Sequence, residues 1–191
     1  RIIGRGDPAM DADEPMRYQT AFLIFLVGFV AVTLLGISIK LSAAVAIAFF
    51  VQYYLMTMIV GRIRAEMGLP THEIERLGPT VTLGNILGPR LLGKQNLTSL
   101  SVFFGFTRGL RNLPYPLMLE GLYLGGRTGL DGRRLLIAAM AVIPLATAFG
   151  YFWNLMLGYE HGIGADWNRW MPWSSQEAWR QLEGWLNADR G

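Results

Sequence analysis

Three long stretches of the chain contain no charged residue, and they set its organisation. The first, Ala21 to Ile39, has 19 residues, and the second, Leu41 to Val60, has 20. The third, Leu135 to Tyr159, has 25 residues and includes Pro144 and Gly150, which membrane helices tolerate. A helix needs about 20 apolar residues to cross roughly 30 Å of hydrocarbon. Each stretch therefore predicts a membrane-spanning helix.

The first two stretches are separated by a single charged residue, Lys40. So short a link predicts an antiparallel helical hairpin with its tip around Gly36 to Ser42, where the lysine can reach the interface. A signal peptide does not fit, because 20 polar residues precede the first stretch and a second stretch follows at once. Asp131 is placed to cap the third helix.

The segment between the second and third spans predicts short helices. Leu77 to Gly93 carries four glycines and two prolines, which argues against continuous helix. Asn96 to Phe106 is apolar but too short to span, and is typical of an interfacial or re-entrant segment. Leu117 to Leu124 predicts a short apolar helix that carries Glu120. Gly121 and Gly125 form a GxxxG pattern there, which permits close helix packing.

Tryptophan is concentrated in the tail. Five of the six tryptophans lie within 19 residues: Trp167, Trp170, Trp173, Trp179 and Trp185. Tryptophan favours the membrane–water interface, so these residues are expected to anchor the tail there. Ser174 and Glu177 fit a capping box. We expect Ser175 to Asn187 to form an amphipathic helix on the outer membrane surface, or else one packed against a partner protein.

Composition agrees with a membrane protein: 52% of residues are hydrophobic and 16% are charged, with no cysteine. The absence of cysteine excludes disulfides, thiol catalysis and cysteine-based metal sites. The sequence predicts an all-α integral membrane fold with three transmembrane helices, amphipathic or re-entrant segments and a Trp-rich interfacial helix. The expected regions are an N-terminal segment (1–19), a transmembrane hairpin (20–61), a cytoplasmic loop (62–132), a third transmembrane helix (133–160) and an extracytoplasmic tail (161–191).

The basic residues predict an orientation. Of the 17 Lys and Arg residues, 13 lie before the first span or between Arg62 and Arg134. The positive-inside rule places these regions in the cytoplasm and the C-terminus outside, in the periplasm of a bacterial inner membrane.

Few side chains suggest chemistry. Gln52 and Asn154 are polar residues within spans, and an interhelical hydrogen bond is the expected role of each. His161 is a candidate axial ligand for a haem or pigment, with an ordinary interfacial histidine as the alternative. The spacing of His72, Glu73 and Glu75 does not match a zinc motif. No residue set supports catalysis or metal binding, so we do not expect an enzyme.

The arginines of the central segment indicate no specific site. Arg108, Arg111 and Arg127 suit anionic lipid headgroups, or belong to the basic cytoplasmic side. The sequence gives no indication of a nucleic-acid partner.

One resemblance covers residues 5–187. The stretch Arg62 to His72 (RIRAEMGLPTH), directly after a span, resembles a motif of large uncharacterised bacterial membrane proteins that are similar to oligopeptide transporters. Asp13 to Tyr18, Asn112 with Pro116 and Glu120, and Arg133 with Arg134 agree with it. In such proteins this region is the later part of a chain with many more spans.

Two functions follow as expectations. The first is a non-catalytic accessory subunit of a larger respiratory or photosynthetic type of complex, with lipids and other transmembrane subunits as partners and pigment or haem within reach. The alternative, implied by the resemblance, is a piece of a transporter. The chain begins at Arg1 rather than Met, which suggests a fragment or processed form.

Overall fold

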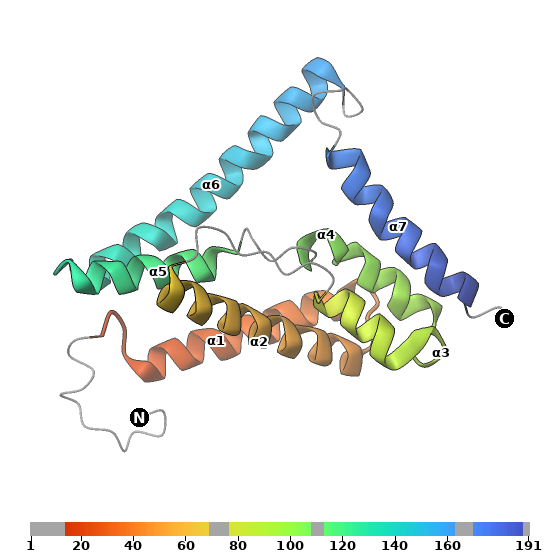
Figure 1. Cartoon of the computed structure of the whole chain (residues 1–191), viewed down its shortest axis with the longest axis horizontal. Coiled ribbons are helices and arrows are strands. Elements are labelled where there is room, and N and C mark those ends of the chain that lie inside the picture. Colours follow the sequence, from red (N-terminus) through yellow and green to blue (C-terminus); the bar gives the residue numbers. More distant parts are fainter. Residues whose placement is uncertain (1–13, 69–76, 108–112, 163–169, 189–191) are drawn as a thin grey trace.

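The computed structural model describes residues 14–68, 77–107, 113–162 and 170–188, and these are almost entirely helical (Figure 1). The helices are α1 (Tyr18–Ser38), α2 (Ala43–Met67), α3 (Pro79–Val102), α4 (Phe104–Thr107), α5 (Pro114–Arg127), α6 (Gly132–His161) and α7 (Trp170–Ala188). Three of them, α1, α2 and α6, are long and apolar enough to cross a membrane. The prediction of an all-α membrane fold with three such helices is confirmed at this level.

α1 and α2 form the expected antiparallel hairpin. Lys40 lies in the turn between them, with a positive φ of 73°. Midway along the pair, the ring of Tyr54 contacts Phe25 and Phe29 of α1, with centroids 5.2 and 6.0 Å apart. Near the turn, Gly36 of α1 lies against Phe50 of α2, and this position leaves little room for a side chain. Small and aromatic residues therefore hold the two helices together.

α3 is a helical hairpin rather than a straight helix. Gly88 and Gly93 interrupt it with φ near 70° and ψ of 158°, a region that only glycine enters freely. The two arms, residues 79–87 and 94–102, run back along each other. Thr80, at the start of the first arm, lies beside Leu100 and Thr107, near the end of the second. The prediction that Leu77 to Gly93 is not continuous helix is confirmed.

The second arm of α3 begins at the tip of the α1–α2 hairpin. The side-chain amide of Asn96 accepts a hydrogen bond of 2.8 Å from the Ser42 backbone, and Ser99 donates one of 2.7 Å to the Ile39 carbonyl. Gln95 donates to the Lys40 carbonyl. All three bonds hold this arm to one end of the hairpin.

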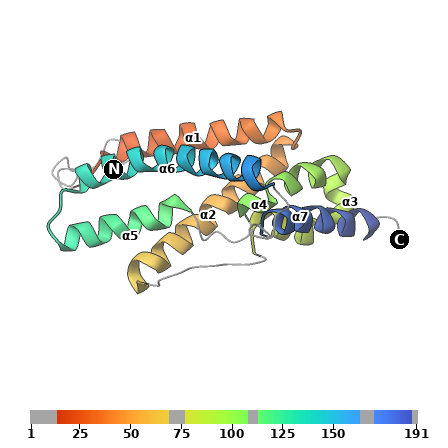
Figure 2. The same ribbon diagram turned by 90° about the horizontal axis from the view of Figure 1, so that it is seen from above.

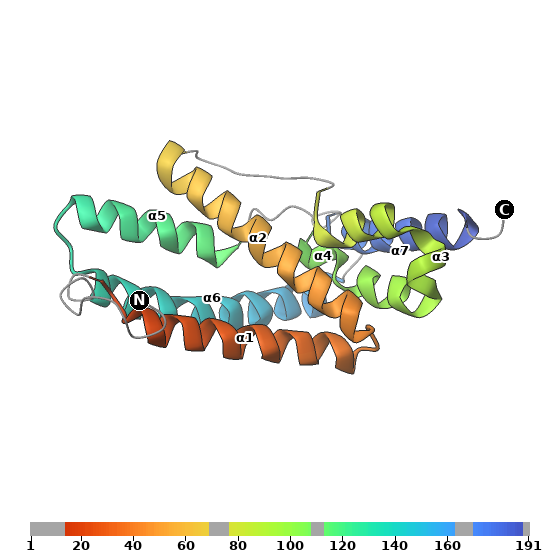
Figure 3. The ribbon, with the colours of Figure 1, turned by 90° about the horizontal axis from the view of Figure 1, so that it is seen from below.

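From there the chain follows α2 towards its other end. Phe103 contacts Phe49, and Phe106 stacks on Tyr53 at 5.3 Å. α5 continues in the same direction, with Tyr115 against Gly61 and then Glu120 against Arg64 (Figure 3). Residues 95–107 and 114–127 thus run parallel to α2, one after the other along its length.

The single cytoplasmic loop expected at 62–132 stays a prediction. Among its described residues, the polar bonds at 95–99 tie that segment to the Lys40 end of the hairpin, whereas Glu120 pairs with Arg64 near the opposite end. Described parts of this segment therefore lie at both ends of the hairpin. The hairpin itself also extends further than expected, since α2 continues to Met67.

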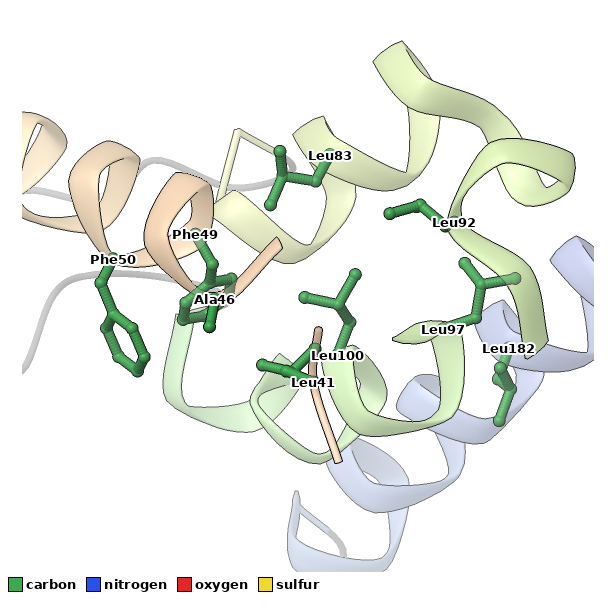
Figure 4. Packing of buried hydrophobic residues seen from close by; sticks show 9 residues of the cluster. All are labelled: Leu41, Ala46, Phe49, Phe50, Leu83, Leu92, Leu97, Leu100 and Leu182. Carbon is green, nitrogen blue, oxygen red and sulfur yellow. The ribbon is translucent and has the colours of Figure 1, made fainter. Parts of the chain in front are cut away.

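A small hydrophobic core joins α2, α3 and α7 (Figure 4). Phe49, Leu97 and Leu100 are almost completely buried in it, and α7 contributes Leu182. Trp185 of α7 lies directly against Gly84, where any side chain would collide with the indole. The tail helix therefore packs on α3 of its own chain, where the sequence suggested a membrane surface or a partner protein.

Two details of the tail differ from the sequence prediction. α7 begins at Trp170, so Ser174 lies inside the helix and the predicted capping box is wrong. Trp179, expected like the other tryptophans to anchor the tail, is 53% exposed, whereas Leu182 is 7% exposed. Trp179 lies about 100° around the helix from Ala178, which is enough to turn it away from α3.

α6 departs from the other helices. It begins beside α1, where Gly132 lies near Pro15, and then diverges from the α1–α2 hairpin (Figures 1 and 2). None of its 30 residues, all of them described, is buried. Asp131 caps it as predicted, accepting a 2.9 Å hydrogen bond from the Arg133 backbone. The helix meets the rest of the chain chiefly through α5.

We expect the bend of α3 and the α1–α2 turn to lie on the same side of the membrane. The chain has no cysteine, so single cysteines can be introduced at Leu91, Lys40 and Met67 and labelled with an impermeant maleimide in sealed vesicles of known orientation. Leu91→Cys, 75% exposed in the native structure, should label from the side that labels Lys40→Cys. Labelling of Leu91→Cys together with Met67→Cys would support a single loop instead.

We also expect Trp185, and not Trp179, to hold the tail. Trp185→Ala should weaken docking of α7 by about 2 kcal/mol, below the range for a fully buried tryptophan because this one is half-buried. That equals a roughly thirtyfold rise in the opened form, measurable as faster proteolysis of the tail. Trp179→Ala removes the same side chain from an exposed position and is the matched control. Equal effects of the two variants would contradict this role.

Candidate functional site

The most unusual feature of the fold is that the run of helix alongside α2 is in two pieces, α4 and α5. α4 ends at Thr107, one residue after the Phe106–Tyr53 contact, and α5 begins at Pro114, one residue before the Tyr115–Gly61 contact. Tyr53 and Gly61 are eight residues apart, or about 12 Å along the helix. The apolar part of α2 lies between the polar residues Ser42 and Arg62. Tyr53 is near the middle of this part, so α4 ends at that level.

A third chain segment reaches the same level. Gly78, directly before α3, packs against the backbone of Thr107, and this contact leaves no room for a side chain at Gly78. Thr80 and Thr107, both almost completely buried, have hydroxyls 3.1 Å apart. Thr107 also donates to the Phe103 carbonyl. These bonds satisfy both hydroxyls and hold the start of α3 to the end of α4.

Two helices start along this stretch of α2: α3 starts at the level of Thr107, and α5 starts about 12 Å further on, at Gly61. They begin with Pro79 and Pro114, and neither N-cap residue, Gly78 or Leu113, supplies a capping side chain. The first turn of a helix presents unpaired N–H groups and a partial positive charge. The starts of α3 and α5 therefore suit a polar or negatively charged group. α1 and α2 are continuous helices and offer no such backbone groups along their length.

An ion pair fixes α5 against α2 below the interruption. Arg64 donates to Glu120 at 2.6 Å, and their side chains are only 12% and 25% exposed. By contrast, Arg62 and Glu66, one helical turn apart on α2, form an exposed pair of 2.9 Å. The Arg64–Glu120 pair joins residues 56 positions apart in sequence, so it holds two helices together. The Arg62–Glu66 pair lies within one helix and does not.

The two polar residues of the predicted spans behave differently. Asn154 donates to the Gly150 carbonyl of its own helix at 2.8 Å, so its expected interhelical bond is absent from the described chain. Gln52 is half-buried on α2 and forms no hydrogen bond within the part of the chain that the structure describes. Neither residue joins the interruption.

The glycines of the GxxxG pattern have separate surroundings. Gly125 lies directly against Leu135 at the point where α5 meets α6. Gly121 has no described atom within 4 Å of its missing side chain and lines a groove of about 610 Å³ between the two helices. Thr147 is the single polar residue among those that line this groove.

The remaining predicted residues lie away from the interruption or outside the described residues. His161 is exposed at the end of α6, and Trp173 and Trp179 are exposed on α7. Trp170 starts α7. Arg127 lies over the ring of Tyr123, with 4.7 Å between the guanidinium carbon and the ring centroid. Residues outside the described part are Trp167, His72, Glu73, Glu75, Arg108 and Arg111.

Sequence reasoning missed the residues that form the interruption. Thr80, Thr107 and Arg64 are ordinary residues in the sequence, and their contacts span 20 residues or more. The available signal was the placement of Pro79 and Pro114, each at the start of a short apolar segment, because proline favours the first position of a helix.

We expect loss of Glu120 to loosen α5. Glu120→Ala should lower the free energy of unfolding by roughly 3 kcal/mol, because the charge of Arg64 stays in a largely buried place after its ion pair with Glu120 is lost. The measurement is thermal or denaturant unfolding in detergent micelles. Glu66→Ala, which breaks the exposed pair, should change stability by less than about 0.5 kcal/mol. A double variant, Arg64→Met with Glu120→Leu, should recover much of the loss, and failure to recover would argue against the ion pair as the cause.

Comparison with known proteins identifies the family but no activity. No curated protein and no solved structure matches this chain. The whole chain, residues 1–191, matches a family of unknown function, DUF6785. The protein is therefore a member of the DUF6785 family.

Proposed function

We propose that this chain forms the part of a membrane transporter that lines the path of the solute. The observation that carries the proposal is the interrupted run alongside α2, in which α4 ends near the middle of the apolar part of α2 and α5 begins about 12 Å further on, at Gly61. The alternative expected from the sequence becomes the leading interpretation, ahead of an accessory subunit.

The physical argument concerns backbone hydrogen bonds. A helix satisfies its own N–H and C=O groups along its length, but the end of one helix and the start of the next leave several such groups without helical partners. Such breaks persist only when protein covers them or when they line a water-filled cavity. Transporters commonly bind solutes at breaks of this kind near the bilayer midplane, where helix starts face the solute.

The chemistry at the break suggests a type of solute. The uncapped starts of α3 and α5 suit a negatively charged group, such as the terminal carboxylate of a peptide. This agrees with the resemblance to oligopeptide transporters. We place the protein in a bacterial inner membrane with the Arg62 end of α2 in the cytoplasm, as the basic residues suggest.

An accessory subunit is the second candidate, and α6 is the observation that favours it. All of its 30 residues are at least partly exposed, among them a stacked pair, Phe149 and Trp153, with ring centroids 6.2 Å apart. A helix that is apolar on every side requires lipid, pigment or other helices around it. In that role His161, at the end of α6, would be the first residue to examine for haem or pigment contact.

Water access to the break distinguishes the two functions. We expect Pro114→Cys to react with a small, charged methanethiosulfonate reagent in intact membranes, because a solute path admits water. Leu23→Cys, 60% exposed towards the start of α1 and so closer to the depth of Gly61, should react at least ten times more slowly because it faces hydrocarbon. Uptake of a labelled tripeptide by cells that express the protein is the companion measurement.

Equal, slow reaction at the two positions would count against a water-lined path and favour the accessory role. Proline at the first position of a helix contributes no hydrogen bond, so its replacement should leave the fold intact.

A further inference from the structure

α5 and α6 form a helical hairpin with an open groove between them. The two helices touch near the turn that connects them, where Leu135 packs against Gly125, and the groove begins beside this contact. Its volume is about 610 Å³, a size typical of small-molecule sites. Gly121 lines the groove, and no described atom beyond its own turn of helix lies within 4 Å of the place that a side chain would take. Small residues also line the other wall, at Ala138, Ala139 and Ala146.

The lining of the groove is apolar and requires no polar partner. Thr147 is the single polar residue among those that line it, and its hydroxyl donates to the Ile143 carbonyl of its own helix at 2.8 Å. A polar solute placed here would lose its hydrogen bonds to water without replacement, which costs free energy. A hydrocarbon chain loses none, so the groove suits an apolar occupant.

The position of the groove along α6 matches one leaflet of a bilayer. Arg133 and Arg134 come directly before Leu135, which is the first lining residue on α6, and Thr147 is the last. These 12 steps of helix correspond to about 18 Å. Half of the hydrocarbon core is about 15 Å thick, and a tilted helix covers less depth than its length. The groove therefore extends from the level of the headgroups to about the middle of the bilayer, as an acyl chain does.

The width of the groove favours a single chain over a helix. A volume of 610 Å³ over about 18 Å gives a mean cross-section of about 34 Å². A helix with its side chains is at least about 10 Å across, which corresponds to about 80 Å². A whole helix therefore does not fit inside the groove, whereas one extended hydrocarbon chain does.

The end of the groove at the membrane surface carries positive charge. Residues 127–134 contain three arginines, Arg127, Arg133 and Arg134, and one acid, Asp131. Asp131 is already engaged, because it pairs with Arg134 at 3.3 Å and caps α6. The side chain of Arg133 is exposed and has no partner among the described residues. The net charge of two positive units at this level attracts the phosphate of an anionic lipid.

We propose that the α5–α6 groove binds an anionic phospholipid, with one acyl chain between the two helices and the phosphate beside the arginines of the turn. The inference does not rest on the proposed transport function, because a lipid can occupy this groove whether or not water reaches the start of α5.

Titration of the purified full chain in mild detergent, followed by native mass spectrometry, tests the site. The probes are phosphatidylglycerol, which is anionic, and phosphatidylcholine, which has the same acyl chains and no net charge. One phosphatidylglycerol should bind per chain, at least about ten times more tightly than phosphatidylcholine, because two net positive charges attract it.

Two variants separate the groove from the charge. Gly121→Leu fills the groove and should weaken binding of phosphatidylglycerol at least tenfold. Leucine favours a helix more than glycine does, so the loss would not reflect unfolding of α5. Gly28→Leu is the matched control, because Gly28 lies on α1 in similarly open surroundings. Arg133→Gln should weaken binding about fivefold while its backbone bond to Asp131 remains, whereas Arg180→Gln, exposed on α7, should have no effect.

Three results would overturn the proposal. Undiminished binding of phosphatidylglycerol in Gly121→Leu would exclude the groove as the site. Equal dissociation constants for the two lipids would exclude recognition of the phosphate charge by the arginines. A dimer that Gly121→Leu disrupts would show that a second copy of the chain occupies the groove instead of lipid.

Discussion

Three hydrogen bonds between α3 and the α1–α2 turn determine how the rest of the chain is arranged. A tight turn between two apolar helices leaves backbone groups unpaired at the end of the first and the start of the second. Gln95, Asn96 and Ser99 bond to three of these groups, at Lys40, Ser42 and Ile39. The bonds fix the register of residues 95–107 against α2. From that register follow the Phe103 and Phe106 contacts and the level at which α4 ends.

α2 then acts as the common support of the other helices. α1 packs on one side through the rings around Tyr54, and the two pieces α4 and α5 pack on another through Phe49, Gly61 and Arg64. Helix ends at membrane depth need protein around them, and α2 packs beside the end of α4 and the start of α5. Many hydroxyls of the described helices are used locally. Those that donate to the carbonyl four residues earlier are Thr33, Thr57, Thr82, Thr98, Ser101, Thr107, Thr128 and Thr147.

The sequence predicted the features that depend on local pattern. Uncharged stretches located α1, α2 and α6, glycine content located the interruption of α3, and Asp131 was identified as a cap. The partnership of residues 95–107 with α2 was not predictable in this way. Asn96 to Phe106 is too short for a span and carries polar residues whose partners lie more than 50 positions away. Likewise, nothing local to Trp185 indicates that a glycine at position 84 leaves space for its ring.

The same limits explain why the tail was assigned to a membrane surface. Tryptophan favours both the interface and large packed contacts, and its position in sequence does not separate the two. The space at Gly84 decides the matter for Trp185, whereas Trp179 remains exposed. α6, which leads to this tail, is about 45 Å long, well beyond the roughly 30 Å of hydrocarbon. A helix of that length can stay in the bilayer by tilting, and the divergence of α6 from α1 in Figure 1 agrees with a tilt. Leu135 packs against Gly125 where α5 meets α6, so contacts with its own chain hold α6 at its start. The exposed sides of α6 further along are then open to lipid or to other helices.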